Sequence, residues 1–477
     1  MNEVKPISII VQSSEHSHSN LYNELEKINF KSLHLKYPIE KNRREGSATA
    51  RPQEKWATIK DITGYKSDDI RDQYALFQDS MKWILICGQC LGLNPVMGLL
   101  EKDSSNMRFK YFSWRFLHGI LLCFIQMVAT LLCLYKLYRT FISIKLLAFL
   151  SYYAATGMTT FLFIRVAAKW PSVLQGVYNS NLDEYIDTNL KFKCRITIGV
   201  MLTLAIVEHI LSLISNMSET LDCGDKLDYL YEAYIEHSFP WLFEIGMPFS
   251  VPLGIIIQFL NLTCTLNWSY SDFFIICISF YLTSILEQIS TKVIFSRDKS
   301  LPPAFWRQLR EDYTQAGRLV RNFDNAISGI IFTSFASNLF FICLQLFNVL
   351  SHGLRAKPPA ESCPNFPSGP FGGFENVVYF TFSLVYVLAR FLAVSLVTAN
   401  IHSTSNEPAS ALYDIPSSAY CSEIQRFIEQ VHGETLALSG LQFFHITKSL
   451  VLTVASTIVT YELVLLQFNG EEMVHRS

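Results

Sequence analysis

Repeated apolar runs constrain this chain more than any other feature of its sequence. Half of the 477 residues are hydrophobic, 17% are charged, and the formal net charge is −2. An α-helix needs about 20 predominantly apolar residues to cross a bilayer, and several runs reach or exceed that length. The sequence therefore predicts an all-α, polytopic membrane protein, and nucleic acid is not an expected partner.

Seven transmembrane helices are predicted, and only the fourth is ambiguous. Residues 248–292 are apolar over about twice the length of one span. Basic residues such as Lys292, Arg297 and Lys299 follow this run, and two spans would place them outside, against the positive-inside rule. We therefore expect one long helix that continues into the cytosol. The other six spans are predicted at residues 111–134, 146–167, 196–214, 326–350, 374–400 and 449–468.

Loop charges predict an inverted topology, with a cytosolic N-terminus and an extracellular C-terminus. The first residues lack the basic start and apolar core of a cleaved signal peptide. Lys and Arg flank the loop between the second and third helices, whereas Asp and Glu dominate the loop after the third helix. Asn216, in the sequon Asn-Met-Ser, lies on this outer loop near the membrane edge and is a possible glycosylation acceptor. A disulfide between Cys223 and Cys363, both in outer loops, is left open.

The polar tail has no sustained periodicity, and the apolar segment after it is interrupted by glycines and Pro95. The predicted organisation is a cytosolic, mostly disordered tail (1–79), an interfacial or re-entrant helix (80–110), transmembrane helices one to four forming a ligand-binding bundle (111–272), a cytosolic helical anchor region (273–325), helices five and six (326–400), a cytosolic anchor segment (401–444), and the seventh helix with a short extracellular tail (445–477).

The last apolar run, residues 449–468, carries a polar stripe. At spacings of four, three, four and three, the stripe contains Thr453, Thr457, Thr460, Val464 and Gln467. In one interpretation each hydroxyl bonds back to its own helix or packs against a neighbour. In the other, the stripe lines a water-filled pore, with Val464 and Phe468 as a constriction and Gln467 as a polar ring. Since one helix cannot enclose a pore, the second interpretation requires several copies around an axis. The predicted pore and gate residues are Thr457, Thr460, Val464, Gln467 and Phe468.

The string TYELVLLQF, residues 460–468, resembles the C-terminal motif of the insect gustatory receptors, which reads Thr-Tyr, five mostly apolar residues, then Gln-Phe. The chain departs from that pattern only at Glu462. The strings RVAAKWP, VEHILSLI and ETLALSG and the segment 306–350 resemble the sugar-receptor branch of the same family.

This resemblance implies an insect chemoreceptor ion-channel fold and a plasma-membrane location in gustatory neurons. It also implies a ligand-gated, non-selective cation channel that is a homotetramer or a tetramer with related subunits, surrounded by lipid. In that family the seventh helices line the pore, cytosolic helices anchor the subunits, and the ligand pocket opens outward. Val464, Gln467 and Phe468 match the gate-bearing positions by motif, whereas no pocket residue carries over by motif.

Polar groups at membrane depth are expensive and are therefore candidates for a ligand site. Glu208 and His209 fall in the outer half of the third helix, where a pair that fixes helix packing is an equally weighted alternative. Aromatic planes cover the C–H faces of a sugar ring, and polar side chains replace the water on its hydroxyls. Singly, each aromatic is more typical of interfacial packing. The predicted sugar-binding set is Glu208, His209, Tyr152, Tyr153, Thr156, Trp241, Glu244, Gln345, Asn348, Asn376 and Tyr379.

Other charged residues receive no ligand role. Arg165 and Arg390 are expected either to snorkel to headgroups or to pair with acids on the inner side. Asp272 and Glu287 are assigned to the cytosolic continuation of the fourth helix.

Two other classes of protein are weighed. A heptahelical G-protein-coupled receptor would place its N-terminus outside, which the loop charges oppose. A secondary sugar transporter would be expected to show internal repeats or paired broken helices, and none is evident. The sequence has no metal-ligand cluster, nucleophile elbow or phosphate loop, so we expect no enzyme activity, metal or cofactor.

Overall fold

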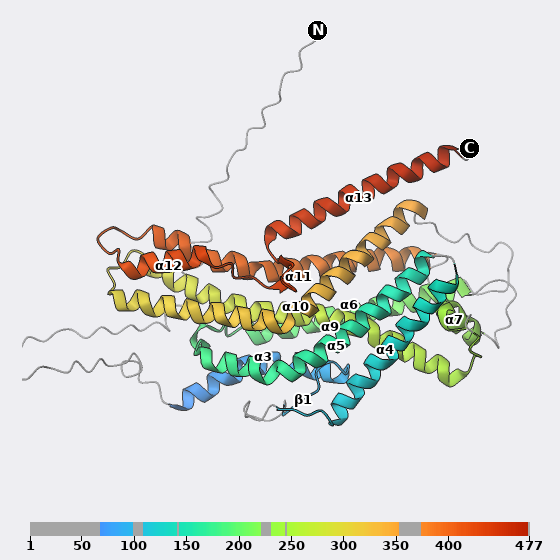
Figure 1. The fold of residues 1–477 in the computed structure, drawn as a ribbon, viewed down its shortest axis with the longest axis horizontal. Coiled ribbons are helices and arrows are strands. Elements are labelled where there is room, and N and C mark those ends of the chain that lie inside the picture. Colours follow the sequence, from blue (N-terminus) through green and yellow to red (C-terminus); the bar gives the residue numbers. More distant parts are fainter. Residues whose placement is uncertain are drawn as a thin grey trace, which may run out of the picture. The chain divides into compact units, whose positions relative to one another are not determined.

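Long helices form the protein in a computed structural model that describes residues 67–98, 108–140, 143–220, 230–243, 246–352 and 374–475 (Figure 1). The helices are α3 (Ser67–Cys90), α4 (Trp114–Arg139), α5 (Ile144–Ser180), α6 (Leu190–Thr220), α7 (Leu230–Ser238), α8 (Pro240–Phe243), α9 (Val251–Ser296), α10 (Pro303–His352), α11 (Glu375–Tyr413), α12 (Ser422–Gly433) and α13 (Lys448–His475), with the 3-10 helix η3 (Asp183–Tyr185). Two antiparallel hairpins complete the list: β1 (Val96–Met97) with β2 (Arg108–Phe109), and β3 (Ser439–Gly440) with β4 (Phe444–His445).

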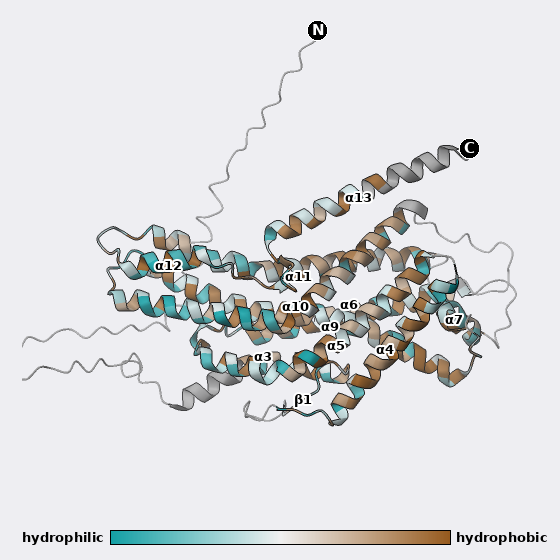
Figure 2. Cartoon of the chain, viewed as in Figure 1, coloured by the Kyte–Doolittle hydropathy of each residue, from teal (hydrophilic) through white to brown (hydrophobic). Residues whose placement is uncertain are grey.

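Six of these helices, α4, α5, α6, α9, α10 and α11, are long and apolar enough to cross a membrane. The apolar part of α13 that the structure describes in detail is shorter, Lys448–Tyr461. Figure 2 shows hydrophobic residues along α4, whereas hydrophilic residues gather on α12 and on the adjoining part of α10. The predicted polytopic, all-α membrane protein is confirmed.

Helix α9 is the centre of the bundle. Its 46 residues form one helix, as predicted. In its most apolar stretch of 18 residues, 78% of the residues are buried. Helices α5, α6, α10 and α11 all contact it. Aromatic rings pack against α9 along its length. The ring centre of Phe163 on α5 lies 5.1 Å from that of Phe274, and the ring centre of Phe323 on α10 lies 5.9 Å from that of Tyr281. Such tilted and edge-to-face aromatic pairs add stability beyond their buried area.

The prediction of a disordered tail is wrong for residues 67–79, because α3 begins at Ser67. Phe77, Met81 and Leu85 follow one another at helical spacing and are all buried against the core of the bundle. The helix extends only to Cys90, where Gly92 turns the chain with a φ of 72°, and β1 follows. The sequence did not reveal the start of α3, because its first turns are mostly polar and contain no continuous apolar run.

A buried carboxylate of α12 forms ion pairs with α10. Glu423 is only 4% exposed, and its oxygens lie 3.1 Å from Arg310 and Arg426 and 3.7 Å from Arg307. Burial opposes ionisation of Glu423, but the arginines outweigh it and hold its pKa below the ordinary value of 4.5. The carboxylate therefore stabilises the docked helix at neutral pH.

We expect Glu423→Gln to raise amide hydrogen exchange across Ser422–Gly433 at pH 7, because the arginines lose their anion. A group with a lowered pKa in the folded state stabilises above its unfolded pKa and loses that effect only as pH falls through the folded value. In the unmodified protein, α12 exchange corrected for the intrinsic rate should therefore stay constant from neutrality down to pH 5. Glu429→Gln, on the exposed face of the same helix, is the matched control. Equal exchange in the two variants would contradict the proposed docking.

Candidate ligand-binding cavity

A cavity of about 250 Å³ lies where α5, α6, α7, α9, α10 and α11 meet. Its walls mix aromatic, amide, hydroxyl and charged side chains. They are Lys145, Ala148, Phe149, Tyr152, Glu208, His209, Ser212, Asn216, Tyr234, Ser238, Phe239, Asn261, Thr265, Trp268, Phe341, Gln345, Tyr379 and Ser383. A concave site with a few convergent polar groups is typical of small-molecule binding.

Five predicted ligand residues, from four helices that are distant in sequence, line this cavity. They are Tyr152 on α5, Glu208 and His209 on α6, Gln345 on α10, and Tyr379 on α11. The structure thus brings five of the eleven predicted residues together.

A chain of hydrogen bonds crosses one wall of the cavity. Gln345 Nε2 donates to Ser383 Oγ at 2.9 Å, and Ser383 Oγ donates to Glu208 Oε1 at 2.8 Å. The chain joins α10, α11 and α6, and Ser383 is only 2% exposed. A change at any of the three side chains therefore affects the other two.

Another part of the cavity lining is aromatic. The rings of Trp268 and Phe341 lie 4.7 Å apart, and Tyr152 lies 6.3 Å from Trp268. The Tyr152 hydroxyl donates to the backbone carbonyl of Asn261 at 3.1 Å and lies 2.9 Å from Thr265 Oγ1. The cavity lining therefore combines aromatic rings with a polar chain.

The remaining predicted ligand residues lie elsewhere. Tyr153 and Trp241, with ring centres 5.2 Å apart, belong to a separate apolar cluster with α4 and α9. Thr156 packs beside the cavity and donates to the carbonyl of Tyr152. Asn376 is hydrogen bonded to Ser215, Asn348 is half-buried on α10, and neither is among the lining residues. Glu244 lies outside the described residues.

Sequence reasoning missed most of the lining residues, among them Ser383, Asn261, Thr265 and Trp268. Ser383 gave no signal, because a single serine in an apolar helix is common. Asn261, Thr265 and Trp268 were detectable, since spacings of four and three place them on one face of α9.

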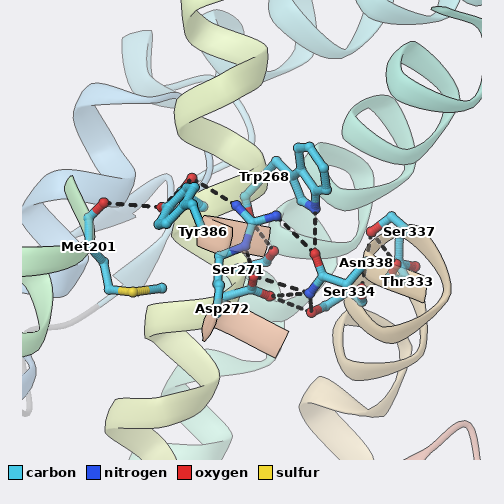
Figure 3. A network of polar contacts seen from close by, with 11 residues as sticks. Met201, Trp268, Ser271, Asp272, Thr333, Ser334, Ser337, Asn338 and Tyr386 are labelled. Atoms are coloured by element: carbon cyan, nitrogen blue, oxygen red, sulfur yellow. Dashed lines mark hydrogen bonds and ion pairs between the residues drawn. The ribbon is translucent and has the colours of Figure 1, made fainter. Parts of the chain in front are cut away.

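A buried ion pair lies next to the aromatic wall. Arg390 Nε of α11 is 2.8 Å from Asp272 Oδ2 of α9, and the two side chains are 2% and 0% exposed. Arg390 also donates to Asn338 at 2.9 Å and lies 4.2 Å from the Trp268 ring centre. Figure 3 shows Trp268, Asn338 and Asp272 converging, with Ser334 donating to Asp272. Arg390 thus pairs with an acid and does not snorkel, because its guanidinium group is buried within the bundle beside Asp272.

Helix α13 contacts α10 and α11, but much of its surface is uncovered (Figure 1). Leu452, Val459 and Val464 are 73%, 59% and 40% exposed. The hydroxyls of Thr457 and Thr460 donate to carbonyls of their own helix at 2.8 and 2.9 Å, which is the first of the two interpretations of the stripe. The side chains of residues 467 and 468 lie outside the described part, so the pore interpretation remains a prediction.

Known proteins resemble this chain over most of its length. Residues 60–477 match the family model described as "Trehalose receptor". From Drosophila melanogaster, the gustatory receptor for sugar taste 64f is 29% identical over 401 residues, which are 83% of this chain and 81% of that receptor. The gustatory receptor 5a for trehalose, also from Drosophila melanogaster, is 28% identical over 83% of this chain and 86% of its own length.

A solved structure shares the fold. The insect olfactory receptor OR5 from Machilis hrabei superposes with a TM-score of 0.58 and 15% sequence identity, over 83% of this chain and 100% of that chain. The helices described above are therefore arranged as in an insect chemoreceptor.

Proposed function

Because this chain belongs to the trehalose receptor family, we propose that it is a gustatory sugar receptor that opens a non-selective cation channel when sugar binds. The sequence resemblance to the sugar-receptor branch is confirmed by the match over residues 60–477. The observation that carries the proposal is the cavity, whose lining contains Trp268 and Tyr152 together with the chain from Gln345 to Glu208. Aromatic planes combined with hydrogen-bonding groups suit a sugar ring, which is apolar on its faces and polar on its rim.

The proposed channel is a homotetramer, or a tetramer with related subunits, in the plasma membrane of gustatory neurons. The exposed apolar face of α13 supports this, since a helix of this length with an uncovered apolar side is stabilised by neighbours or lipid. The proposed topology keeps the N-terminus cytosolic, so that the basic segment after α9 stays inside. In the assembled pore, Thr457, Thr460, Val464, Gln467 and Phe468 face the axis, and sugar binding shifts the population towards the open state.

The test is whole-cell current from this chain expressed alone and challenged with a panel of mono- and disaccharides. We expect a sugar-evoked cation current, and we expect Gln467→Ala and Phe468→Ala to change its rectification or leak. Glu208→Gln should weaken the response to sugar while leaving rectification unchanged, because it changes the proposed ligand site and not the pore.

Two controls separate the alternatives. Blocking G proteins should not alter the current, and a G-protein-dependent response would refute the channel. Saturable sugar uptake without single-channel events would indicate a transporter instead. Silence with good surface expression would be followed by co-expression with a related receptor subunit, and silence there would refute the proposal.

A further inference from the structure

The ligand cavity is elongated along α5 and α6. On α6 the lining residues His209 and Asn216 are seven positions apart, which is a rise of about 10 Å. On α5 the lining residues Lys145 and Tyr152 have the same separation. Tyr152 and His209 lie at one end of the cavity, since their side chains are 2.9 and 3.4 Å from Thr265 Oγ1. Lys145 and Asn216 therefore mark the other end, which the proposed topology places on the outer side.

Asn216 faces the cavity at this outer end. Together with Glu208 and Ser212, which also line the cavity, it follows a spacing of four along α6. Residues four apart in a helix point about 40° apart, so the three side chains leave α6 on one face. Asn216 is half-buried, and its side-chain amide forms no hydrogen bond with the part of the chain that the structure describes. This amide, which can donate and accept, is therefore available to a ligand.

Asn216 is also the acceptor of the sequon Asn-Met-Ser. The sequence predicted an outer loop for it, but the structure places it within α6, which ends at Thr220. Ser218 points about 200° away from Asn216 around the helix, and its hydroxyl donates to Glu375 of α11 at 3.4 Å. An N-linked glycan is bulky and is typical of surface loops. A glycan on Asn216 would begin at the cavity lining, in the space that a ligand needs.

We propose that Asn216 is an unmodified ligand-contact residue, and that a covalent group on its side chain and a bound sugar exclude one another. The proposal rests on the proposed function, because it adds a contact to the same cavity and assigns the chemical state of that side chain. It predicts that the sequon carries no glycan in the receptor that binds sugar.

Asn216→Cys tests the exclusion. The full-length variant is expressed in cells and treated from outside with a membrane-impermeant, positively charged methanethiosulfonate, with and without trehalose, sucrose or glucose. Labelling of residue 216 is followed over time by peptide mass spectrometry. At a sugar concentration of about ten times the Kd, about one-tenth of the cavities stay empty, so we expect a bound sugar to slow labelling about tenfold. Complete labelling before sugar is added should abolish the sugar-evoked current.

Two further variants accompany this experiment. Glu236→Cys is the matched control, because Glu236 is exposed on α7 and lies between the lining residues Tyr234 and Ser238 without lining the cavity itself. Its labelling should proceed at the same rate with and without sugar. Ser212→Cys is a second probe on the same face of α6, one turn deeper, and sugar should protect it as well. It replaces Asn216→Cys if that variant does not reach the surface.

Ser218→Ala tests the state of the sequon. It removes the sequon while leaving the Asn216 side chain in place. Peptide mass spectrometry of the original protein should show Asn216 without a glycan, and the two proteins should give the same sugar response.

The outcomes are distinct. A glycan on Asn216 in a receptor that responds to sugar would overturn the inference. So would equal labelling of Asn216→Cys, or of Ser212→Cys in its place, with and without a sugar that evokes current, and in both cases the sugar receptor itself would stand. Absence of any response to trehalose, sucrose and glucose in the original protein, alone and with a related subunit, would refute the proposed function together with the inference.

Discussion

Arg390→Met is expected to destabilise the protein by about 3–5 kcal/mol, because it leaves Asp272 as a buried charge without its cation. Asp272 is 0% exposed, and the hydrogen bonds from Ser334 and Asn338 that remain are neutral. The measurement is the thermal midpoint of the detergent-solubilised protein, followed by size-exclusion chromatography of the heated sample.

Two variants control this result. Lys193→Met breaks an ion pair of the same length, 2.8 Å between Lys193 and Asp187. Because the Lys193 side chain is 50% exposed, we expect this variant to lose at most about 1 kcal/mol of stability. The double variant Asp272→Leu/Arg390→Met removes both charges and should recover part of the lost stability. Equal thermal midpoints for Arg390→Met and Lys193→Met would contradict the prediction, because they would show that the buried pair contributes no more to stability than the exposed one.

Gly119→Ala is the second change with a large expected effect, about 1–3 kcal/mol of destabilisation from overpacking. A Cβ at Gly119 would lie 2.5 Å from the carbonyl oxygen of Gly92, which is backbone and cannot rotate away. This contact docks α4 on the turn after α3, beside the hydrogen bond from Arg115 to the carbonyl of Val96 at 3.0 Å. Lower surface expression and a lower thermal midpoint are the expected readouts.

Gly199→Ala is the matched control, because it is the same change in another apolar helix. No atom lies within 4 Å of a Cβ at Gly199. Alanine favours a helix over glycine by about 0.5–1 kcal/mol, so this variant should be as stable as the original or slightly more stable. Loss of stability in both variants would point to a general intolerance of the helices and not to the contact with Gly92.

Much of the fold was predictable because apolar length and loop charge depend only on local sequence. The basic residues after residue 292 were enough to identify α9 as one helix. Helix ends were not predictable in the same way, because an apolar run marks only the part of a helix that suits lipid. Helix α10, for example, begins at Pro303, well before its apolar run, and its polar first half packs against α11 and α12.

The cavity was predictable only in part, because the direction in which each side chain points around its helix was not predictable. Tyr152 and Tyr153 are neighbours in sequence and at nearly the same depth, yet only Tyr152 lines the cavity. Consecutive residues of a helix point about 100° apart, so one of them had to face another way. Likewise, Gln345 lines the cavity and Asn348 does not. Which residue of each pair faces the cavity depends on how α5 and α10 are rotated about their axes relative to α9, and one sequence does not specify that rotation.

The length of α9 has a mechanical consequence. Its 46 residues span about 69 Å, which is more than twice the thickness of the hydrocarbon layer, about 30 Å. Trp268 lies near its middle, and Lys292, bonded to Glu184 at 2.7 Å, lies near its far end. Because α9 is one continuous helix, a small tilt beside the cavity would displace its far end, at the contact with η3, by a larger distance.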